Sequence, residues 1–410
     1  MNPSSPSAVL PLEGVPVFDI DPFGDAFLTD PYQAHEQMRE LGPFVWIPKY
    51  GVLATGRHEQ VRAVLNDHKT FISSAGVGLA NFHSETPFRP KSLILEADPP
   101  DHTKARTVLA RVLSPKTVMQ IRERFTAEAE TLVDSLMARA AAGEVIDGVT
   151  QLSEVYPLKV FPDAVGVPSA QRENLLLYGD MIFNAFGPRN ALFDRAVERV
   201  KPVTEWIMAH CNRENLAPGG FGEQIFRAAD AGEITYAEAP LLVRSFLSAG
   251  VDTTVNGIGN ALDCFARHPE QWERLRADLS LARPAFEEVL RYESTVQFFF
   301  RTTGCDTELA GVCIPKNQKV QSFFGAANRD PRQWPQPDTF DIGRKPVGHM
   351  AFGSGIHGCV GQVVARLEGE LILTALAKRV KTIEPAGPAV RRLNNTLRAL
   401  GSLPLRLIPA

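Results

Sequence analysis

One cysteine lies in a segment whose residue types suit chemistry at sulfur. Residues 352–361 read FGSGIHGCVG, so glycines at alternating positions lead up to Cys359, and an apolar helical pattern follows at once. A sulfur at a helix N-terminus is favoured as thiolate, because backbone N–H groups and the helix dipole stabilise the negative charge. A thiolate is either a nucleophile or a metal ligand. His357, two residues earlier, is a candidate base for a nucleophile, and a buried inert cysteine is the third interpretation.

A second segment places poor helix formers in the middle of a predicted helix. Thr235 and Glu238 have the spacing of a capping box, and the helical pattern that they open continues to about Arg267. At 1.5 Å per residue, this pattern predicts one helix about 45 Å long that crosses the protein. Its middle, residues 249–254, reads AGVDTT, in which only the alanine is a good helix former. Two interpretations stay open: an incidental surface turn, or a groove opened against a bound group.

The elements that must position these segments are mostly helical. Amphipathic helical patterns dominate from about Pro31 onward. Short strand-like runs are expected at 45–47, 52–54, 298–301, 312–314 and 319–321. The first two predict a hairpin, and no linker or repeat divides the 410 residues. We therefore expect a mainly α fold with small β-sheets, in a single domain of residues 1–410 with an extended N-terminal arm at residues 1–20.

Charge and composition limit the kind of partner. The chain carries 43 Lys and Arg against 47 Asp and Glu, a net charge of −4, so we expect no nucleic-acid partner. The first 20 residues hold prolines and no basic residue, which predicts neither a signal peptide nor a membrane anchor. The 5 cysteines are widely spread without CxxC spacing, so we expect neither a disulfide framework nor a zinc site. These features predict a cytoplasmic protein that binds a small molecule or another protein.

Three motifs together resemble the cytochrome P450 family. Residues 352–361 match F-x-x-G-x-x-x-C-x-G, the haem-ligand loop of that family. Residues 288–291 match its E-x-x-R pair, and residues 249–254 match the A-G-x-D-T-T signature of its oxygen-binding helix. The resemblance implies the family's mainly α fold, haem b as cofactor with Cys359 as the iron ligand, and monooxygenase chemistry with O2.

The resemblance also implies which residues surround the haem. The positions that match the family's cofactor-binding residues are His102, Arg106, Gly250, Arg301, Phe352, His357 and Cys359. The histidines and arginines among them would neutralise the two haem propionates, because buried carboxylates without partners are costly. Asp252 and Thr253 match the family's catalytic acid and alcohol, which relay protons and hold oxygen. Each charged residue, taken singly, also fits a solvated surface.

One position departs from the family. The family usually has arginine where this chain has Thr339, so the third member of the network around Glu288 and Arg291 is missing from its normal place. Arg344 is the candidate substitute.

Electrons must come from partner proteins, because the chain has no flavin or iron–sulfur motif. The resemblance implies NAD(P)H, a ferredoxin reductase and a [2Fe-2S] ferredoxin, and we expect the chain to act as a monomer. Residues 102–122 contain several Lys and Arg and no acid, which suits an acidic ferredoxin. A merely solvated basic helix is the alternative.

Within the family, the chain resembles the bacterial subfamily that oxidises para-substituted benzoates, typically 4-methoxybenzoate O-demethylases. The similar stretches include 89–100, 183–188, 241–245 and 298–301. The substrate residues implied are Arg89, Ser92, Arg244 and Ser245 for the carboxylate, Phe183, Phe186 and Phe299 for the ring, and Ser248 also facing the pocket. Arginine with hydroxyl donors suits a carboxylate, and phenylalanine faces pack a flat ring. The alternatives are another small aromatic substrate, such as a methoxyphenol, and a haem-binding sensor without turnover.

Overall fold

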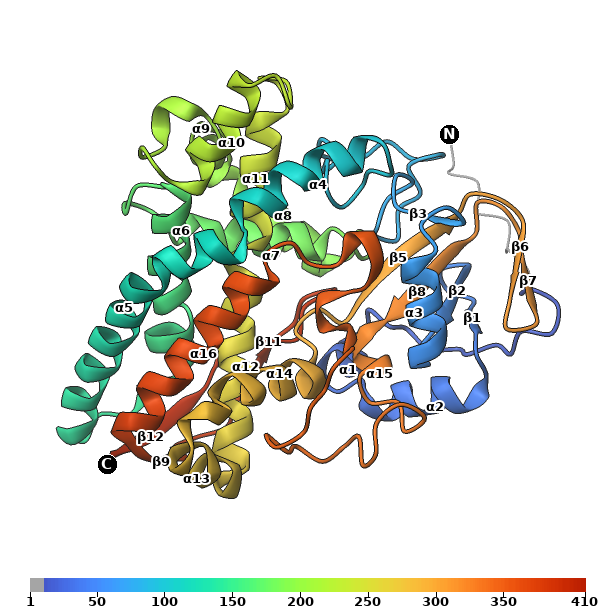
Figure 1. The fold of residues 1–410 in the computed structure, drawn as a ribbon. Helices are drawn as coiled ribbons and strands as arrows, with labels where there is room; N and C mark the ends of the chain where they lie inside the picture. Colours follow the sequence, from blue (N-terminus) through green and yellow to red (C-terminus); the bar gives the residue numbers. More distant parts are fainter. Residues whose placement is uncertain (1–10) are drawn as a thin grey trace.

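The computed structural model describes residues 11–410 and is mainly helical, as predicted (Figure 1). Its α-helices are α1 (Asp25–Thr29), α2 (Tyr32–Leu41), α3 (His58–Asn66), α4 (Asp101–Val112), α5 (Pro115–Ala141), α6 (Val155–Val165), α7 (Asn174–Asn184), α8 (Ala191–Val200), α9 (Thr204–Ala209), α10 (Phe221–Asp230), α11 (Ala239–Ala249), α12 (Asp252–Arg267), α13 (Pro269–Ala277), α14 (Ala282–Glu293), α15 (Phe324–Ala327) and α16 (Gln362–Arg379). Among residues 11–410, no helix is long and apolar enough to cross a membrane.

Within the same residues, the strands build one larger sheet and three small ones. The strands are β1 (Val45–Ile47), β2 (Val52–Thr55), β3 (Phe71–Ile72), β4 (Ile146–Asp147), β5 (Phe298–Thr303), β6 (Thr307–Leu309), β7 (Val312–Ile314), β8 (Lys319–Phe323), β9 (Val380–Pro385), β10 (Val390–Arg392), β11 (Ala399–Ser402) and β12 (Pro404–Pro409). The larger sheet has the order β1-β2-β8-β5-β3, and the others are β4-β12-β9, β10-β11 and β6-β7. In the larger sheet, only β2 and β8 pair in parallel.

The predicted hairpin is confirmed, with Trp46 of β1 opposite Leu53 of β2 and both strands fully buried. The other predicted strands also form, although β7 pairs with β6 outside the larger sheet. Residues 11–20 of the predicted N-terminal arm lie beside β1 in space. There, the Phe18 N–H donates to the Trp46 carbonyl at 2.8 Å. Residues 1–10 lie outside the described part of the chain.

The prediction of a single helix over residues 235–267 is wrong, because the segment forms two helices. Helix α11 ends at Ala249, and α12 begins after a short break. At the break, the Thr253 hydroxyl donates to the Ala249 carbonyl at 2.8 Å, so a side chain satisfies this oxygen. The predicted capping box is present: the Thr235 N–H donates to the Glu238 carboxylate at 2.6 Å, and the Glu238 N–H donates to the Thr235 hydroxyl at 3.2 Å.

The main hydrophobic core lies among the helices and anchors α16. This helix packs against α5, α14 and α12 through buried residues that include Leu367, Leu371, Ile372 and Leu376. Since the loop of residues 352–361 directly precedes α16, the packing of α16 also places that loop. Figure 1 shows the larger sheet on the opposite side of the molecule from α5, with α16 and α12 between them.

Candidate active site

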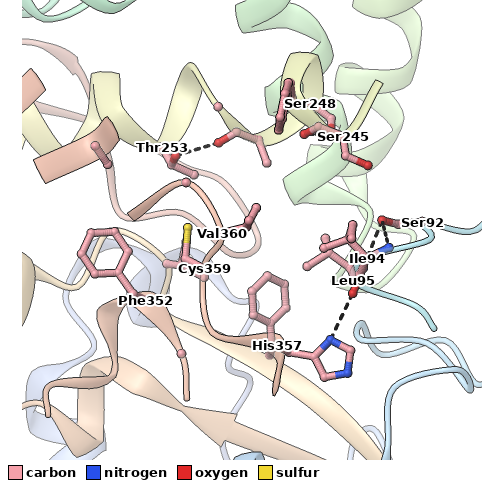
Figure 2. Close-up of a pocket in the computed structure, with 18 of the residues that line it drawn as sticks. Ser92, Ile94, Leu95, Ser245, Ser248, Thr253, Phe352, His357, Cys359 and Val360 are labelled. Carbon is pink, nitrogen blue, oxygen red and sulfur yellow. Dashed lines mark hydrogen bonds between the residues drawn. The ribbon is translucent and has the colours of Figure 1, made fainter. Parts of the chain in front are cut away.

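A cavity of about 220 Å³ lies between the α11–α12 break and the loop before α16 (Figure 2). The predicted site residues that line it are Arg89, Ser92, Arg106, Phe183, Arg244, Ser245, Ser248, Gly250, Thr253, Phe299, Arg301, Phe352, His357 and Cys359. Three predicted residues lie outside the lining: His102, Phe186 and Asp252. The fold therefore brings most of the predicted residues to one cavity from segments far apart in the sequence.

Cys359 faces this cavity from the loop before α16. Its backbone N–H donates to the Phe352 carbonyl at 2.8 Å, which closes the loop. The loop turns at Gly355, where φ is +69° and a Cβ would lie 2.5 Å from a backbone oxygen, so only glycine fits. The Arg106 guanidinium donates to the Gly358 carbonyl at 2.6 Å and so ties the loop to α4.

The electrostatics at Cys359 differ from the sequence expectation. Burial raises the pKa of this thiol, and the Gly361 N–H and the Arg106 guanidinium offset that rise only in part. The helix start alone therefore does not make the sulfur a thiolate. His357 is not paired with Cys359 as a base, because no hydrogen bond joins the two among residues 11–410, and His357 Nδ1 lies instead 3.0 Å from the Ile94 carbonyl oxygen (Figure 2). A metal cation at the sulfur would stabilise the thiolate, which favours the ligand role over the nucleophile.

A cluster of imidazole and guanidinium groups lies on one side of the cavity. The rings of His102 and His357 lie 4.3 Å apart, so His102 stands behind His357, and Nε2 of each is buried without a hydrogen-bond partner among the described residues. Arg301 is buried and donates to the Phe300 carbonyl, and burial lowers its pKa to about 10. Burial also lowers the pKa of His357 to about 3. A buried guanidinium without a carboxylate partner, and imidazoles that gain a proton and become donors beside an anion, fit anionic groups such as the two propionates of haem b.

The predicted acid and alcohol lie in two environments. Thr253 lines the cavity, whereas Asp252 is buried outside the lining, with Oδ1 2.9 Å from the Arg392 guanidinium and 3.3 Å from Asn256 Nδ2. Burial raises the pKa of Asp252, and Arg392 offsets part of that rise. No sequence pattern indicates Arg392, because it reaches Asp252 from β10, far along the chain. A proton route through Asp252 therefore involves Arg392 as well.

The residues predicted for a carboxylate meet at residues 89–92. Arg89 is already paired, with its two terminal nitrogens 2.9 and 3.0 Å from the Glu96 carboxylate. Arg244 is buried and donates to two backbone carbonyls of this segment, at 3.0 and 3.4 Å. Within residues 11–410, no carboxylate lies within ion-pair distance of Arg244. Of the two arginines predicted for the carboxylate, Arg244 is therefore available to an anionic ligand and Arg89 is not.

Serine hydroxyls accompany Arg244 in the lining. Ser92 Oγ accepts hydrogen bonds from two backbone N–H groups, at 3.3 and 3.1 Å, so its own hydrogen remains available to a ligand. Ser245 and Ser248 instead donate to backbone carbonyls of α11, at 3.0 and 3.2 Å. Ser92 is thus the hydroxyl whose present contacts suit an anion.

Three phenylalanines are predicted to pack a substrate ring, and we call Phe183, Phe186 and Phe299 the ring-binding wall. The Phe186 ring meets Phe183 edge-on at 5.8 Å and Phe299 edge-on at 5.2 Å between ring centroids. Phe183 and Phe299 line the cavity, and Phe186 supports both from behind. Other apolar lining residues that the sequence did not single out include Leu95, Phe161, Ile182 and Val296.

A buried acid that no sequence pattern indicates also lines the cavity. Glu368 of α16 lines the cavity, and neither of its carboxyl oxygens has a hydrogen-bond partner among the described residues. Burial raises its pKa well above the ordinary value, which favours the neutral acid over the carboxylate. No sequence signal separates it from the partly exposed Glu370 on the same helix, because only packing decides which of them is buried.

Arg344 contacts the network that Thr339 leaves incomplete. Arg291 holds the buried Glu288 with two hydrogen bonds of 2.8 Å, and Arg344 Nε donates to the same carboxylate at 3.1 Å. Arg344 also donates to the Pro335 carbonyl at 2.7 Å. Arg344 therefore makes a contact with Glu288, as expected of a substitute for the arginine that is missing at position 339.

The basic stretch of residues 102–122 is largely paired with acids. Its ion pairs are Lys104–Glu238, Arg111–Glu233 and Arg122–Glu370, at 2.7, 2.9 and 2.5 Å. These acids belong to segments distant in the sequence and neutralise three of the five Lys and Arg residues, so a basic surface for a ferredoxin stays a prediction. The stretch gives little support for an acidic partner.

Comparisons with known proteins give a consistent result. The family described as Cytochrome P450 matches residues 223–404. Cytochrome p450 CYP199A2 of Rhodopseudomonas palustris is 57% identical over 397 residues, which cover 97% of this chain and 96% of that protein. Cytochrome P450 107B1 of Saccharopolyspora erythraea is 32% identical over 404 residues, covering 95% and 98%. The solved structure of cytochrome P450 CYP109Q5 from Chondromyces apiculatus has a TM-score of 0.80 at 31% identity, covering 96% of this chain and 99% of that one.

Proposed function

The chain belongs to the cytochrome P450 family of haem b monooxygenases, and we propose that it O-demethylates 4-methoxybenzoate to 4-hydroxybenzoate and formaldehyde. The observation that carries this proposal is the buried Arg244 guanidinium at the cavity, which has no carboxylate partner within residues 11–410 and lies in the lining with Ser92. A buried cation without an anion is costly, and a substrate carboxylate would offset that cost through charge-assisted hydrogen bonds.

Haem b fits the cysteine, imidazole and guanidinium groups that line or adjoin the cavity. When bound, haem b supplies the activation of O2 and the insertion of one oxygen atom into the substrate. Cys359 would hold its iron, with Phe352 and Gly250 lining the haem pocket. Its propionates would accept hydrogen bonds from the cluster of His102, Arg106, Arg301 and His357. Beside the propionates the imidazoles would take up protons, and their unpartnered nitrogens would then donate to the propionate oxygens.

The wall and the anchor together would orient the substrate. Phe183 and Phe299 would pack on the faces and edge of the ring, while Arg244 holds its carboxylate. The para substituent points away from the carboxylate by the geometry of benzene, so it would extend toward the side of the cavity that Cys359 lines. The methoxy carbon is then the atom exposed to oxidation.

Protons and electrons complete the reaction. Thr253 would hold oxygen in the cavity through its hydroxyl, and Asp252 would pass protons inward from the side of Arg392. Two electrons from NAD(P)H would arrive through a ferredoxin reductase and a [2Fe-2S] ferredoxin. One oxygen atom of O2 enters the methoxy group, whose hemiacetal releases formaldehyde, and the other leaves as water. We further propose that the enzyme works as a cytoplasmic monomer.

A methoxyphenol is the second candidate substrate. The pairing of Arg89 with Glu96 favours it, because one of the two arginines predicted for the carboxylate is already neutralised. The sensor without turnover is not retained, since the chain belongs to a family of oxidoreductases.

Product analysis of the haem-loaded enzyme with ferredoxin, reductase and NADH tests the proposal. 4-Methoxybenzoate should give 4-hydroxybenzoate and formaldehyde in equal amounts, and 4-methoxyphenol should be oxidised slowly. Faster demethylation of the phenol would assign the second candidate and reject the benzoate.

A further inference from the structure

Lys319 is a buried lysine that the proposed chemistry does not use. It is the first residue of β8 and is 6% exposed. Its Nζ donates to the carbonyl oxygens of Ala75, Gly76 and Gly78 at 3.2, 2.7 and 3.0 Å. Within residues 11–410, no carboxylate lies within ion-pair distance of it, and burial lowers its pKa to about 7. A buried amine whose hydrogen bonds go only to carbonyls, with the Phe300 ring centroid 6.0 Å away, needs a structural reason, because its desolvation is costly.

The segment that Lys319 holds lies against the ring-binding wall. We call residues 75–79 the clasp segment. Val77 lines the cavity, and its carbonyl accepts a hydrogen bond of 2.9 Å from an N–H of β5. The Leu79 N–H donates to the Phe186 carbonyl at 2.8 Å. At Gly78, a Cβ would lie 2.7 Å from the Phe186 Cα, so the two backbones are in direct contact.

We propose that Lys319 is a positioning residue for the substrate: its ammonium occupies a cation site formed by carbonyls of the clasp segment and thereby holds Phe186 and the ring-binding wall in place. The proposal rests on the proposed function in one respect, since it takes the cavity as the site of an aromatic substrate. It holds for a benzoate and for a methoxyphenol alike.

The physical argument concerns the converging carbonyls. Buried carbonyl oxygens that point at one place repel each other, and each loses a hydrogen bond when no donor is present. Groups of backbone carbonyls of this kind bind monovalent cations in proteins. Here the chain supplies the cation on its own side chain. Lys91 offers a contrast, because its ammonium donates to the Ser74 carbonyl at 3.0 Å from an exposed position.

Two measurements on the haem-loaded enzyme test the proposal: amide hydrogen exchange of the clasp segment and titration with 4-methoxybenzoate. Lys319→Met keeps most of the side-chain volume and removes the ammonium. Exchange at residues 75–79 should accelerate about tenfold or more, and affinity should fall about tenfold. Lys91→Met is the matched control and should leave both near wild type. Wild-type exchange in Lys319→Met would overturn the proposal.

A second variant tests the cation site itself. Lys319→Ala leaves room for a free cation, so ammonium chloride should restore slow exchange at residues 75–79 and restore affinity. Choline chloride at equal ionic strength should restore neither, because choline is too large to enter the site. Failure of ammonium to restore slow exchange would show that the carbonyls form no cation site and would also overturn the proposal.

A third variant tests the link to the wall with Lys319 in place, and it serves if Lys319→Met does not fold. Gly78→Ala adds a methyl group against Phe186, so ligand affinity should fall without any dependence on ammonium. Unchanged affinity would break the link between clasp segment and wall. If the wild-type enzyme binds no benzoate, the proposed substrate fails, whereas hydrogen exchange in the Lys319 variants still tests the cation site.

Discussion

At the scale of single residues, burial opposes the charge of several groups at the cavity. It raises the pKa of the Cys359 thiol, lowers that of His357 to about 3 and lowers that of Arg301 to about 10. Haem b would reverse each of these shifts, because an iron cation stabilises a thiolate and propionates stabilise cations. The chemistry of the three residues thus fits one cofactor.

The Thr253 hydroxyl provides a prediction at the same scale. Thr253→Ala should still bind substrate, because the proposed substrate anchor is Arg244, but it should waste reducing equivalents. Without the hydroxyl, protons reach bound oxygen without correct placement, so more hydrogen peroxide and less product should form per NADH. Peroxide and product assays on the same reaction measure this ratio. Wild-type coupling would remove Thr253 from proton delivery.

At the scale of elements, structure that depends on neighbours along the chain could be predicted from the sequence. Structure that depends on tertiary packing could not. The Thr235 capping box and the hairpin at Trp46 depend on neighbours along the chain, and both are present. The break between α11 and α12 depends on packing, since a Cβ at Gly250 would lie 2.2 Å from the Phe161 ring. The poor helix formers at 249–254 marked the place of the break, but the pattern could not say that the helix ends there.

Arg344 provides a prediction at this scale, because it ties the segment after α15 to α14. Arg344→Met should lower the free energy of unfolding of the haem-loaded enzyme by about 1.5–3 kcal/mol, since the buried Glu288 loses a charge-assisted hydrogen bond. Urea unfolding followed by haem absorbance measures the change. Arg274→Met breaks the exposed pair with Asp341 and should cost less than about 1 kcal/mol. An equal loss of unfolding free energy in both variants would show that the Arg344–Glu288 contact stabilises the fold no more than an exposed ion pair does.

At the scale of the whole molecule, a buried carboxylate joins distant parts of the chain. Glu293, at the end of α14, lies 2.5 Å from the Arg398 guanidinium and 2.9 Å from that of Arg267, and the Tyr32 hydroxyl donates to it at 3.0 Å. Burial alone would raise the pKa of Glu293, but the surrounding guanidinium groups hold it well below its ordinary value of 4.5. This network connects α2, α12, α14 and the C-terminal strands.

The low pKa of Glu293 predicts a pH dependence of stability. A carboxyl whose pKa is lower in the folded state stabilises the fold above its unfolded pKa and loses that contribution as pH falls toward the folded value. Glu293→Gln should therefore be less stable than wild type by about 3 kcal/mol at pH 7, and the gap should narrow as pH falls below about 4.5. Thermal unfolding across this pH range measures the gap. A gap that does not change with pH would show that the charge of Glu293 is not responsible.

Which site residues could be predicted from the sequence also depends on the whole fold. The loop at Cys359 was readable because its residue pattern is local, whereas Arg244 was expected from the resemblance to a subfamily. The pairing of Arg89 with Glu96 and of Asp252 with Arg392 could not be read, because each depends on how the folded chain directs two side chains. These pairings decide which charges are free, and so they decide the chemistry of the cavity.

The central claim is that the cavity recognises a carboxylate through Arg244, and a spin-state titration tests it most directly. In the haem-loaded enzyme, the Soret shift should report 4-methoxybenzoate binding about ten- to a hundredfold tighter than 4-methoxybenzamide. Arg244→Met should remove that preference while leaving the affinity for the amide unchanged, and Lys91→Met should keep the preference. Equal binding of acid and amide by the wild-type enzyme would contradict the account.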